Sequence, residues 1–263
     1  MIIGSVLRKF SKIELSTADD KHYILKNNFV SRMAFGLIGV PHLGFRARAK
    51  IIFKEILQSP KSTRILDAGC GYGLYALTLA EKGYYVDSID LDQKRIGSLN
   101  ALRQESPASR ERISAHQGSL TNLPFFDNSY DLIICSDVIE HIADDQASVR
   151  ELARVLKSGG KLILSVPYNS RHNQKIFRMF SHERPGYTRK ELTTLFNPYG
   201  LHLKKDYYYE YWLGARLFGF FNSLNSKTLM GIFFYPCYSL YLLDRLLTIG
   251  EPNGIVIVAE KKS

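Results

Sequence analysis

The sequence is poor in cysteine. Its 263 residues include three, Cys70, Cys135 and Cys237. The number is odd, the three lie far apart, and no two of them form a CxxC pair, so the sequence shows neither a disulfide framework nor a cysteine-based zinc site. Because disulfides are rare in reducing compartments, this composition favours a cytoplasmic protein.

The sequence also lacks an apolar run long enough to span a bilayer. Its longest nearly uncharged stretch, residues 228–243, contains Pro236 and falls short of the roughly 20 apolar residues that a spanning helix needs. Residues 1–10 carry their basic residues after a short apolar stretch, which is the reverse of the order in a signal peptide. We therefore expect no transmembrane helix and no leader.

Acidic residues are outnumbered, since 25 Asp and Glu stand against 35 Lys and Arg and give a net charge of +10. This excess suggests an anionic partner, which could be a nucleic acid, an anionic membrane surface or an acidic substrate. The basic residues are spread along the chain, so a solvated basic surface also explains them. With 45% hydrophobic residues the chain can bury one sizeable core, and we expect one domain with additions.

From Arg64 onward the sequence alternates short apolar segments with helical patterns. We predict strands at residues 64–68, 84–89, 112–117, 130–135, 161–166, 201–209 and 254–260. We predict helices at residues 74–81, 92–103 and 144–156, and a further one after a capping box formed by Thr188 and Glu191. Strands that alternate with helices predict an α/β fold with a doubly wound, mostly parallel seven-stranded sheet.

Two segments stand apart from this alternation. Residues 1–60 are predicted to form a helical N-terminal region whose second helix is basic and carries Arg48, and residues 61–263 to form the main domain. An apolar insertion, residues 211–253, lies between the last two strands and contains many aromatic residues at helical spacing. We interpret the insertion as a lid over an apolar pocket. The alternatives are a membrane contact, and a dimer interface or extra core layer.

A glycine-rich turn, Asp67-Ala-Gly-Cys-Gly-Tyr-Gly73, follows the first predicted strand. Glycines let the backbone turn sharply and approach a ligand closely. Asp90 ends the second predicted strand about 20 residues later, where a carboxylate can bind both hydroxyls of a ribose, while Asp92 is the better cap for the next helix. The turn also satisfies the dinucleotide pattern G-x-G-x-x-A, so these residues leave NAD and S-adenosylmethionine both open.

Further motifs decide between these cofactors. Ile65-Leu-Asp-Ala-Gly-Cys-Gly-Tyr-Gly73 resembles the first motif of class I S-adenosylmethionine-dependent methyltransferases. Leu123-Pro-Phe-Phe-Asp-Asn-Ser-Tyr-Asp131 is similar to the LPF-x-D-x-S-F-D segment of the group that contains the ubiquinone and menaquinone biosynthesis methyltransferases. Ser136-Asp-Val-Ile-Glu-His-Ile142 and Glu151-Leu-Ala-Arg-Val-Leu-Lys-Ser-Gly-Gly-Lys-Leu162 continue the similarity, which covers about residues 62–206. Dehydrogenases do not share this series, so the resemblance implies a Rossmann-like methyltransferase fold and S-adenosylmethionine as cofactor.

The resemblance also implies where the cofactor lies. Residues of the turn would line its methionine and ribose part, namely Asp67, Gly69, Cys70, Gly71 and Gly73. Asp90 would bind the ribose hydroxyls and Leu91 would pack on the adenine. Ser119 and Leu120 would lie at the adenine edge, although many relatives have an aspartate in place of Ser119. The end of the fourth predicted strand, Cys135 with Ser136, would lie near the reacting sulfonium.

Three catalytic candidates follow that strand. Asp137, Glu140 and His141 are spaced i, i+3 and i+4, so they would share one face if a helix began at Asp137. They resemble the E-x-x-E-H metal cluster of a ubiquinone O-methyltransferase subgroup, with Asp137 in place of the first glutamate, and such a set suits a hard divalent cation. The same E-H-I sequence occurs in relatives without a metal. We predict no resident metal and assign His141 as a base or substrate contact, with this metal site as the alternative.

A basic, aromatic segment follows the fifth predicted strand. In the resembling group this region often borders the acceptor pocket, where arginine could bind a carboxylate or phosphate. The substrate-binding candidates are Tyr168, Arg171, His182, Arg184 and Tyr187. An exposed basic loop is the alternative.

Together these features predict an enzyme that transfers a methyl group to a small-molecule acceptor, apolar, lipid-like or glycan-linked, at oxygen. The alternatives are an RNA or protein methyltransferase, suggested by the net charge, and a non-catalytic cofactor-binding protein. The segment Cys135-Ser-Asp-Val lacks the N-P-P-Y type of motif, and no separate RNA-binding domain is visible, so we expect no nucleic-acid partner. Peripheral contact with an anionic membrane and a homodimer stay open.

Overall fold

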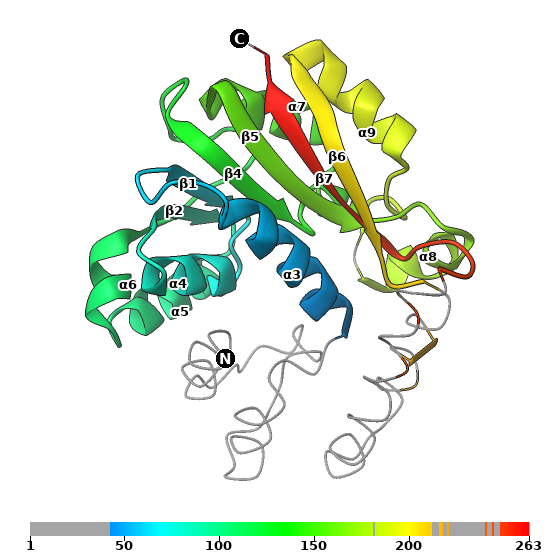
Figure 1. Cartoon of the computed structure of the whole chain (residues 1–263), viewed down its shortest axis with the longest axis horizontal. Coiled ribbons are helices and arrows are strands. Elements are labelled where there is room, and N and C mark those ends of the chain that lie inside the picture. The colour runs from blue at the N-terminus through cyan, green and yellow to red at the C-terminus, as the bar shows by residue number, and fades with distance from the viewer. Residues whose placement is uncertain are drawn as a thin grey trace.

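The computed structural model describes residues 43–180, 182–211, 216, 217, 220, 240, 244 and 248–262 (Figure 1). The first predicted helix and most of the insertion at 211–253 lie outside these residues. No helix within them combines the length and the apolar character needed to cross a bilayer.

A seven-stranded sheet forms the centre, with the strand order β3-β2-β1-β4-β5-β7-β6. Its strands are β1 Arg64–Ala68, β2 Tyr85–Asp90, β3 Ile113–Gln117, β4 Tyr130–Ser136, β5 Leu156–Pro167, β6 Leu201–Tyr209 and β7 Gly254–Lys261. Strands β1 to β5 pair in parallel, and β7 is antiparallel to both β5 and β6. The predicted doubly wound, mostly parallel sheet is therefore confirmed. Its order reverses between β1 and β4, and ligands bind at the carboxyl ends of such strands.

Helices cover both faces of the sheet (Figure 1). They are α3 Leu43–Ile56, α4 Leu74–Glu81, α5 Gln93–Arg103, α6 Pro107–Arg112, α7 Asp145–Val155, α8 Arg171–Ile176 and α9 Arg189–Phe196, with 3-10 turns η1 Ile139–His141, η2 Phe177–Phe180 and η3 Asn197–Tyr199. Buried side chains of α3, α4 and α5 form the core on one face, and those of α7 and α9 form the core on the other.

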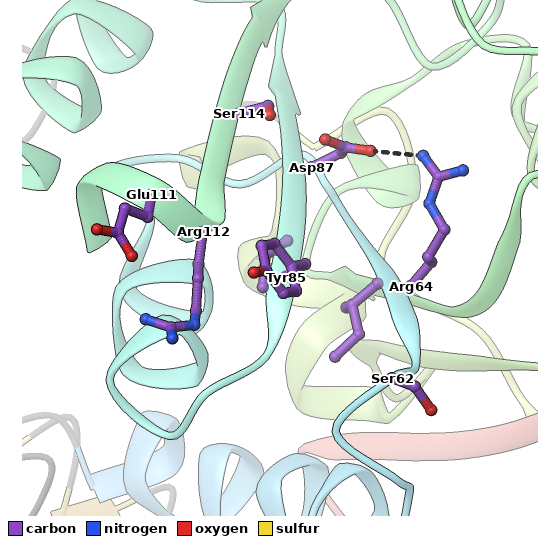
Figure 2. Close-up of a pocket in the computed structure, with 9 residues that line it drawn as sticks. Ser62, Arg64, Tyr85, Asp87, Glu111, Arg112 and Ser114 are labelled. Atoms are coloured by element: carbon purple, nitrogen blue, oxygen red, sulfur yellow. Dashed lines mark ion pairs between the residues drawn. The ribbon is translucent and has the colours of Figure 1, made fainter. Parts of the chain in front are cut away.

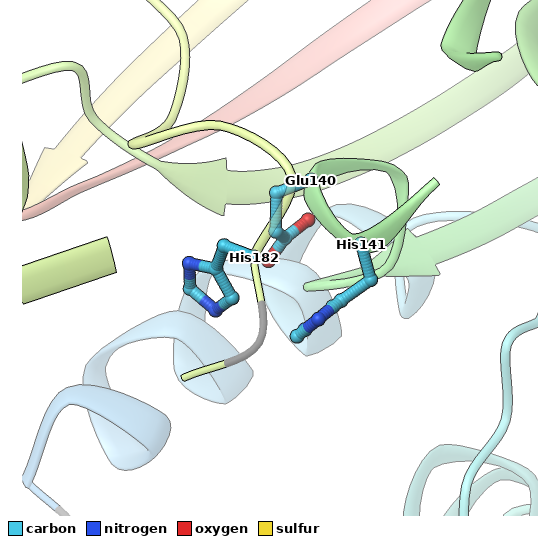
Figure 3. A group of neighbouring side chains, drawn as sticks. All are labelled: Glu140, His141 and His182. Carbon is cyan, nitrogen blue, oxygen red and sulfur yellow. The ribbon is translucent and has the colours of Figure 1, made fainter. Parts of the chain in front are cut away.

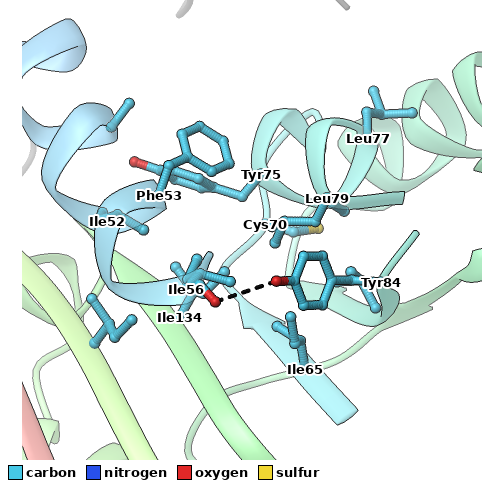
Figure 4. Packing of buried hydrophobic residues seen from close by; sticks show 14 of the residues in the cluster. Ile52, Phe53, Ile56, Ile65, Cys70, Tyr75, Leu77, Leu79, Tyr84 and Ile134 are labelled. Carbon is cyan, nitrogen blue, oxygen red and sulfur yellow. Dashed lines mark hydrogen bonds between the residues drawn. The ribbon is translucent and has the colours of Figure 1, made fainter. Parts of the chain in front are cut away.

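Helix α3 confirms the predicted basic helix and packs directly on the main domain. Ile52 and Ile56 are fully buried, and the ring of Phe53 lies 5.5 Å from that of Tyr75 on α4 (Figure 4). Burying such apolar side chains contributes roughly 1.5–3 kcal/mol each. At the edge of the sheet formed by β6, Glu55 of α3 accepts hydrogen bonds from Lys205 and Tyr207. These contacts hold α3 across the face of the sheet.

Several local details differ from the sequence-based expectation. Helix α6 was not predicted, although Ser106 caps it and Pro107 occupies its first turn, which is a typical start signal. Strand β5 begins at Leu156 instead of residue 161, so α7 ends at Val155. The predicted capping box of Thr188 and Glu191 is confirmed at the start of α9.

Candidate active site

The glycine turn is held against strand β2. The N–H groups of Gly69 and Cys70 both donate to the carbonyl oxygen of Ile89, at 2.8 and 2.9 Å. The N–H of Gly71 donates to Oδ2 of Asp90 at 2.8 Å. The turn and the predicted ribose-binding carboxylate therefore lie next to each other, at the carboxyl ends of β1 and β2.

Three glycines of the turn adopt left-handed backbone conformations, with φ of 76° at Gly69, 54° at Gly71 and 77° at Gly73. A Cβ added to Gly69 would collide with Val138, and one added to Gly73 would collide with Leu99. At Gly71 an added Cβ would meet no atom within 4 Å in the part of the chain that the structure describes. Gly71 therefore faces open space, into which a ligand can approach the backbone.

Asp90 and its neighbours provide further surface for a nucleoside. Oδ1 of Asp90 accepts the N–H of Asp92 at 3.0 Å, while Asp92 caps α5 through the N–H of Lys94 at 2.8 Å, as predicted. Leu91 lies between them with 69% of its surface exposed. A carboxylate beside an exposed apolar side chain suits a ribose carrying a base.

Asp67 offers a buried acceptor to the same ligand. Its Oδ2 atom has no hydrogen-bond partner among the described residues. Burial raises the pKa of Asp67 to about 7, and the charge of Asp90 adds to the shift. A cationic group, such as the amino group of a methionine moiety, would satisfy this oxygen, so the residues present fit the predicted cofactor. Burial also raises the pKa of the neighbouring Cys70 thiol.

The predicted adenine edge lies beside Asp90 as well. The N–H of Gly118 donates to the carbonyl oxygen of Asp90 at 3.0 Å. The Ser119 hydroxyl lies 2.8 Å from that of Thr121 and accepts the Thr121 N–H, and the Leu120 side chain is buried. Because the Ser119 hydroxyl is engaged in its own turn, backbone groups of this loop are better placed to contact a base.

The end of β4 presents Ser136, not Cys135, to the site. The Cys135 side chain is fully buried in the core on the α7 side. The Ser136 hydroxyl lies 3.4 Å from the hydroxyl of Tyr75, a buried residue in the first turn of α4 that was not among the predicted site residues. Cys135 can therefore contribute to a ligand site only through its backbone.

No helix begins at Asp137, so the condition for a face shared by Asp137, Glu140 and His141 is not met. Asp137 has φ of 53°, and a single 3-10 turn, η1, follows it. Its carboxylate forms an ion pair with Arg48 of α3 and accepts a hydrogen bond from the Ser165 hydroxyl at 3.2 Å. Asp137 therefore points to α3 and β5, and it does not share a face with Glu140 and His141.

Arg48 is the centre of a polar group that the sequence did not reveal. Burial lowers its pKa, but the Asp137 carboxylate and the hydroxyls of Tyr209 and Tyr75 more than offset this, so the pKa of Arg48 lies above its ordinary value. The Tyr209 hydroxyl also lies 3.3 Å from that of Ser165. These residues come from α3, α4, β5 and β6, and no local motif connects them.

A second cluster forms beside η1 (Figure 3). Ligand atoms of Glu140, His141 and His182 all lie within 4.8 Å of one another. The two imidazole rings are nearly perpendicular, with centroids 4.5 Å apart. Burial and the charge of His141 lower the pKa of His182 to about 4. His182, a predicted substrate residue, therefore joins the two catalytic candidates that follow β4.

Two other predicted substrate residues make internal contacts. The buried Tyr187 donates its hydroxyl hydrogen to Oδ2 of Asp145 at 2.9 Å. Arg184 forms an ion pair with Asp145 at 3.0 Å and lies over the Tyr187 ring at 4.8 Å. These contacts fix the loop that carries His182.

The last two candidates lie near the end of β5. Tyr168 pairs with Tyr187 in an isolated bridge and its ring lies edge-on to Tyr208 at 5.7 Å. Arg171 is exposed at the start of α8, and its backbone N–H donates to Glu251 at 2.8 Å. Their substrate-binding roles stay predictions.

A cavity of about 280 Å³ lies elsewhere, at the amino ends of β1, β2 and β3 (Figure 2). It is lined by Ser62, Arg64, Ile65, Tyr85, Val86, Asp87, Glu111, Arg112 and Ser114. Arg64 and Asp87 form an ion pair there at 3.6 Å. Because the glycine turn lies at the other end of these strands, this cavity is not the predicted site.

Comparison with known proteins shows that the chain is similar to methyltransferases. Residues 66–164 match a family described as a methyltransferase domain. The chain is 30% identical over 137 residues to a ubiquinone biosynthesis O-methyltransferase of Hydrogenovibrio crunogenus, covering 51% of this chain and 55% of the relative. It is 32% identical over 120 residues to a probable S-adenosylmethionine-dependent methyltransferase of Mycobacterium tuberculosis, covering 46% and 41%. The chain spans about half the length of the curated relatives it matches.

A solved structure shows the same fold. It is a putative sarcosine dimethylglycine methyltransferase from Galdieria sulphuraria, 17% identical, with a TM-score of 0.62 over 88% of this chain and 97% of that one. The predicted class is thus confirmed: residues 66–164 form a methyltransferase domain of the class I type. The predicted cofactor, S-adenosylmethionine, is confirmed with it.

Proposed function

We propose that this chain is an enzyme that transfers a methyl group from S-adenosylmethionine to a hydroxyl oxygen of a small-molecule acceptor that is apolar, lipid-like or glycan-linked. One observation carries the proposal. The glycine turn follows β1, while Glu140 and His141, which lie beside His182, follow the neighbouring strand β4 at the same edge of the sheet.

The cofactor supplies the methyl group and a sulfur leaving group, so the chain has to orient the acceptor and exclude water. An acceptor hydroxyl must also lose its proton, and histidine is the side chain most often used as the base. His141 is exposed and lies against His182, which is neutral at pH 7 because its pKa is about 4. We assign His141 as the base and His182 as its neighbour in the acceptor site.

Support for the acceptor comes from two sources. A matched relative is named for O-methylation in ubiquinone biosynthesis, which supports oxygen as the acceptor atom. The aromatic, apolar composition of residues 211–253, most of which lie outside the described residues, supports an apolar acceptor. A cytoplasmic location, peripheral contact with an anionic membrane and a homodimer belong to the same proposal, and the net charge of +10 supports the membrane contact.

A transfer assay tests the proposal. Purified chain, methyl-labelled S-adenosylmethionine and a cell extract are incubated, and the lipid, small polar, RNA and protein fractions are counted. We expect label in the lipid or small-molecule fraction, in a bond as resistant to mild acid and base as an ether. Label confined to RNA or protein would contradict the proposal.

Two variants test whether methyl transfer depends on His141. His141→Ala should lower transfer by about 100-fold or more, because a general base contributes that much. His172→Ala is the matched control, since His172 is exposed on α8 outside the cluster. Equal activity in the two variants would remove His141 from the role of base.

A further inference from the structure

Glu210 and Asn253 lie side by side at the two ends of the insertion. Glu210 precedes the insertion and Asn253 ends it, next to the pair that Tyr209 of β6 forms with Gly254 of β7. The N–H of Asn253 donates to the carbonyl oxygen of Glu210 at 2.7 Å. The side-chain Nδ2 atom of Asn253 also donates to Oε2 of Glu210, at 2.9 Å. Backbone and side chain therefore both connect the two ends.

The remaining oxygens of the same two side chains are buried acceptors without a donor. Oε1 of Glu210 and Oδ1 of Asn253 have no hydrogen-bond partner among the described residues. An ionised carboxylate only accepts hydrogen bonds, so it cannot satisfy an amide oxygen. A protonated carboxyl carries an O–H donor and can pair with a primary amide through two hydrogen bonds. One proton on Glu210 can therefore satisfy both oxygens.

The surroundings of Glu210 favour this proton. Glu210 is 3% exposed, and burial raises its pKa to about 7. The hydrogen bond from Asn253 and the charge of Arg48 lower the pKa, while the charges of Asp244 and Asp137 raise it. Arg48 is already ion-paired with Asp137, so this cation does not pair with Glu210.

Asn253 also holds the segment that follows β5. Its carbonyl oxygen accepts hydrogen bonds from the N–H of Tyr168 and from Nδ2 of Asn173, both at 2.9 Å. Glu210 itself has φ of 57°, a left-handed conformation that residues other than glycine rarely adopt. Such conformations persist where the surrounding contacts fix them. The contact of Glu210 with Asn253 is therefore connected to Tyr168, a predicted residue of the acceptor site.

We propose that Glu210 and Asn253 form a carboxylic acid–amide pair, which positions residues 168–173 beside the acceptor half and loosens when Glu210 loses its proton. In the intact pair Nδ2 of Asn253 donates to Oε2 of Glu210, and the hydroxyl at Oε1 donates to Oδ1 of Asn253. Loss of the proton leaves two buried oxygens that only accept, together with a buried charge, and both are costly.

The direction of the pH effect follows from the raised pKa. The folded chain keeps the proton up to about pH 7, whereas the ordinary value of 4.5 applies when the chain is unfolded. The stability that the pair contributes is therefore complete below about pH 4.5 and lost as the pH rises through 7. The positioning role in methyl transfer rests on the function proposed above, but the pair itself does not.

Amide hydrogen exchange, followed by mass spectrometry, tests the pair without cofactor or acceptor. The full chain and Glu210→Gln are compared at pH 6 and pH 8 in peptides that contain the N–H groups of Tyr168 and Asn253. Glutamine keeps the shape of the side chain and supplies a donor that does not titrate. We expect equal exchange at pH 6. At pH 8 the wild type should exchange about 10-fold faster than Glu210→Gln, because its carboxyl is then mostly ionised.

Two controls accompany this comparison. Asp67 titrates in the same pH range, but both chains retain it, so its contribution is common to them. Glu111→Gln replaces an exposed carboxylate on α6 and should exchange as the wild type does at both pH values. Circular dichroism checks that each variant is folded. Equal exchange of the wild type and Glu210→Gln at pH 8 would overturn the proposal, as would a Glu111→Gln variant that is protected like Glu210→Gln.

Methyl transfer then tests the positioning role separately. In the labelling assay above, activity of the wild type should fall relative to Glu210→Gln between pH 6 and pH 8. Identical pH profiles would show that the pair does not position the acceptor site. Absence of transfer in both chains would contradict the proposed function and leave the exchange result, and the pair, standing.

Discussion

The edge of the sheet at the carboxyl ends of β1 and β4 has two parts, which are built in different ways. The cofactor half contains the glycine turn and Asp90, and the acceptor half contains Asp137 and the Glu140–His141–His182 cluster. The glycine turn, Asp90 and Leu91 come from one continuous segment, β1 to α5, and backbone hydrogen bonds fix their positions. In the acceptor half, side chains from distant segments meet: Arg48 pairs with Asp137, and His182 lies beside Glu140 and His141. Local backbone geometry leaves a motif in the sequence, whereas contacts between distant side chains leave none. The following substitutions test this division.

The largest effect is expected from removing the cation that links α3 to the acceptor half. Arg48→Met leaves Asp137 without its partner, and breaking a buried ion pair from one side costs 3–5 kcal/mol when both groups are fully buried. Since the Asp137 side chain keeps 30% exposure, we expect a loss of about 3 kcal/mol in the free energy of unfolding in urea.

Two further variants test whether that loss of stability comes from the broken ion pair. Adding Asp137→Asn to Arg48→Met should recover part of the stability, and asparagine tolerates the left-handed backbone at this position. Lys50→Met, at an exposed position of the same helix, should change the free energy of unfolding by less than about 0.5 kcal/mol. Similar losses for Arg48→Met and Lys50→Met would show that the ion pair does not hold the two segments together.

The next effect concerns the cofactor half alone. Asp90→Ala should weaken S-adenosylmethionine binding on the order of 100-fold in equilibrium dialysis, because hydrogen bonds to a charged group contribute about 1.5–3 kcal/mol each. Asp92→Ala should keep the affinity within about 3-fold and lose about 1 kcal/mol of stability, since Asp92 caps α5. Equal affinities in the two variants would show that Asp90 does not bind the ribose.

Asp67 should make stability depend on pH. Its pKa is about 7 in the folded chain and near 3.8 when unfolded, so between these values the folded state holds the proton and the unfolded state has lost it. The free energy of unfolding therefore falls as pH rises through this window. Asp67→Asn lacks this loss and should gain about 2 kcal/mol relative to wild type between pH 5 and pH 8 in urea unfolding. Parallel pH profiles would contradict the buried, protonated carboxyl.

The smallest effect is expected from two glycine variants. They distinguish a block to the approach of the ligand from backbone strain alone. Gly71 and Gly200 both have left-handed φ values, 54° and 70°, with no described atom within 4 Å of an added Cβ. Alanine at either position should cost roughly 1–2 kcal/mol of stability, measured by urea unfolding. Only Gly71→Ala should also weaken S-adenosylmethionine binding. If Gly200→Ala lowers the affinity equally, the open space beside Gly71 is not the cofactor site.

The same division explains how far the sequence could be used for prediction. The sheet and the cap at Asp92 depend on short segments, and their patterns predicted them. The positions of Arg48 and Tyr75 in the site depend on how α3 and α4 cross the sheet, which no local pattern encodes.

Asp137 shows the limit of helical spacing as a guide. Its i, i+3, i+4 relation to Glu140 and His141 would place three side chains together only in an α-helix. The left-handed backbone at Asp137 and the short turn η1 break that relation. His182 then completes the cluster from a loop that precedes α9, and its neighbour Arg184 is tied to Asp145.

The most direct test of this account is a calorimetric titration of S-adenosylmethionine into the wild-type chain and into Glu140→Gln. We predict one site per chain in both proteins, with affinities within about 3-fold, because Glu140 lies in the acceptor half. A wild-type chain that takes up no S-adenosylmethionine would contradict the assignment of the glycine turn. A Glu140→Gln chain that loses the cofactor would contradict the division of the site into two halves.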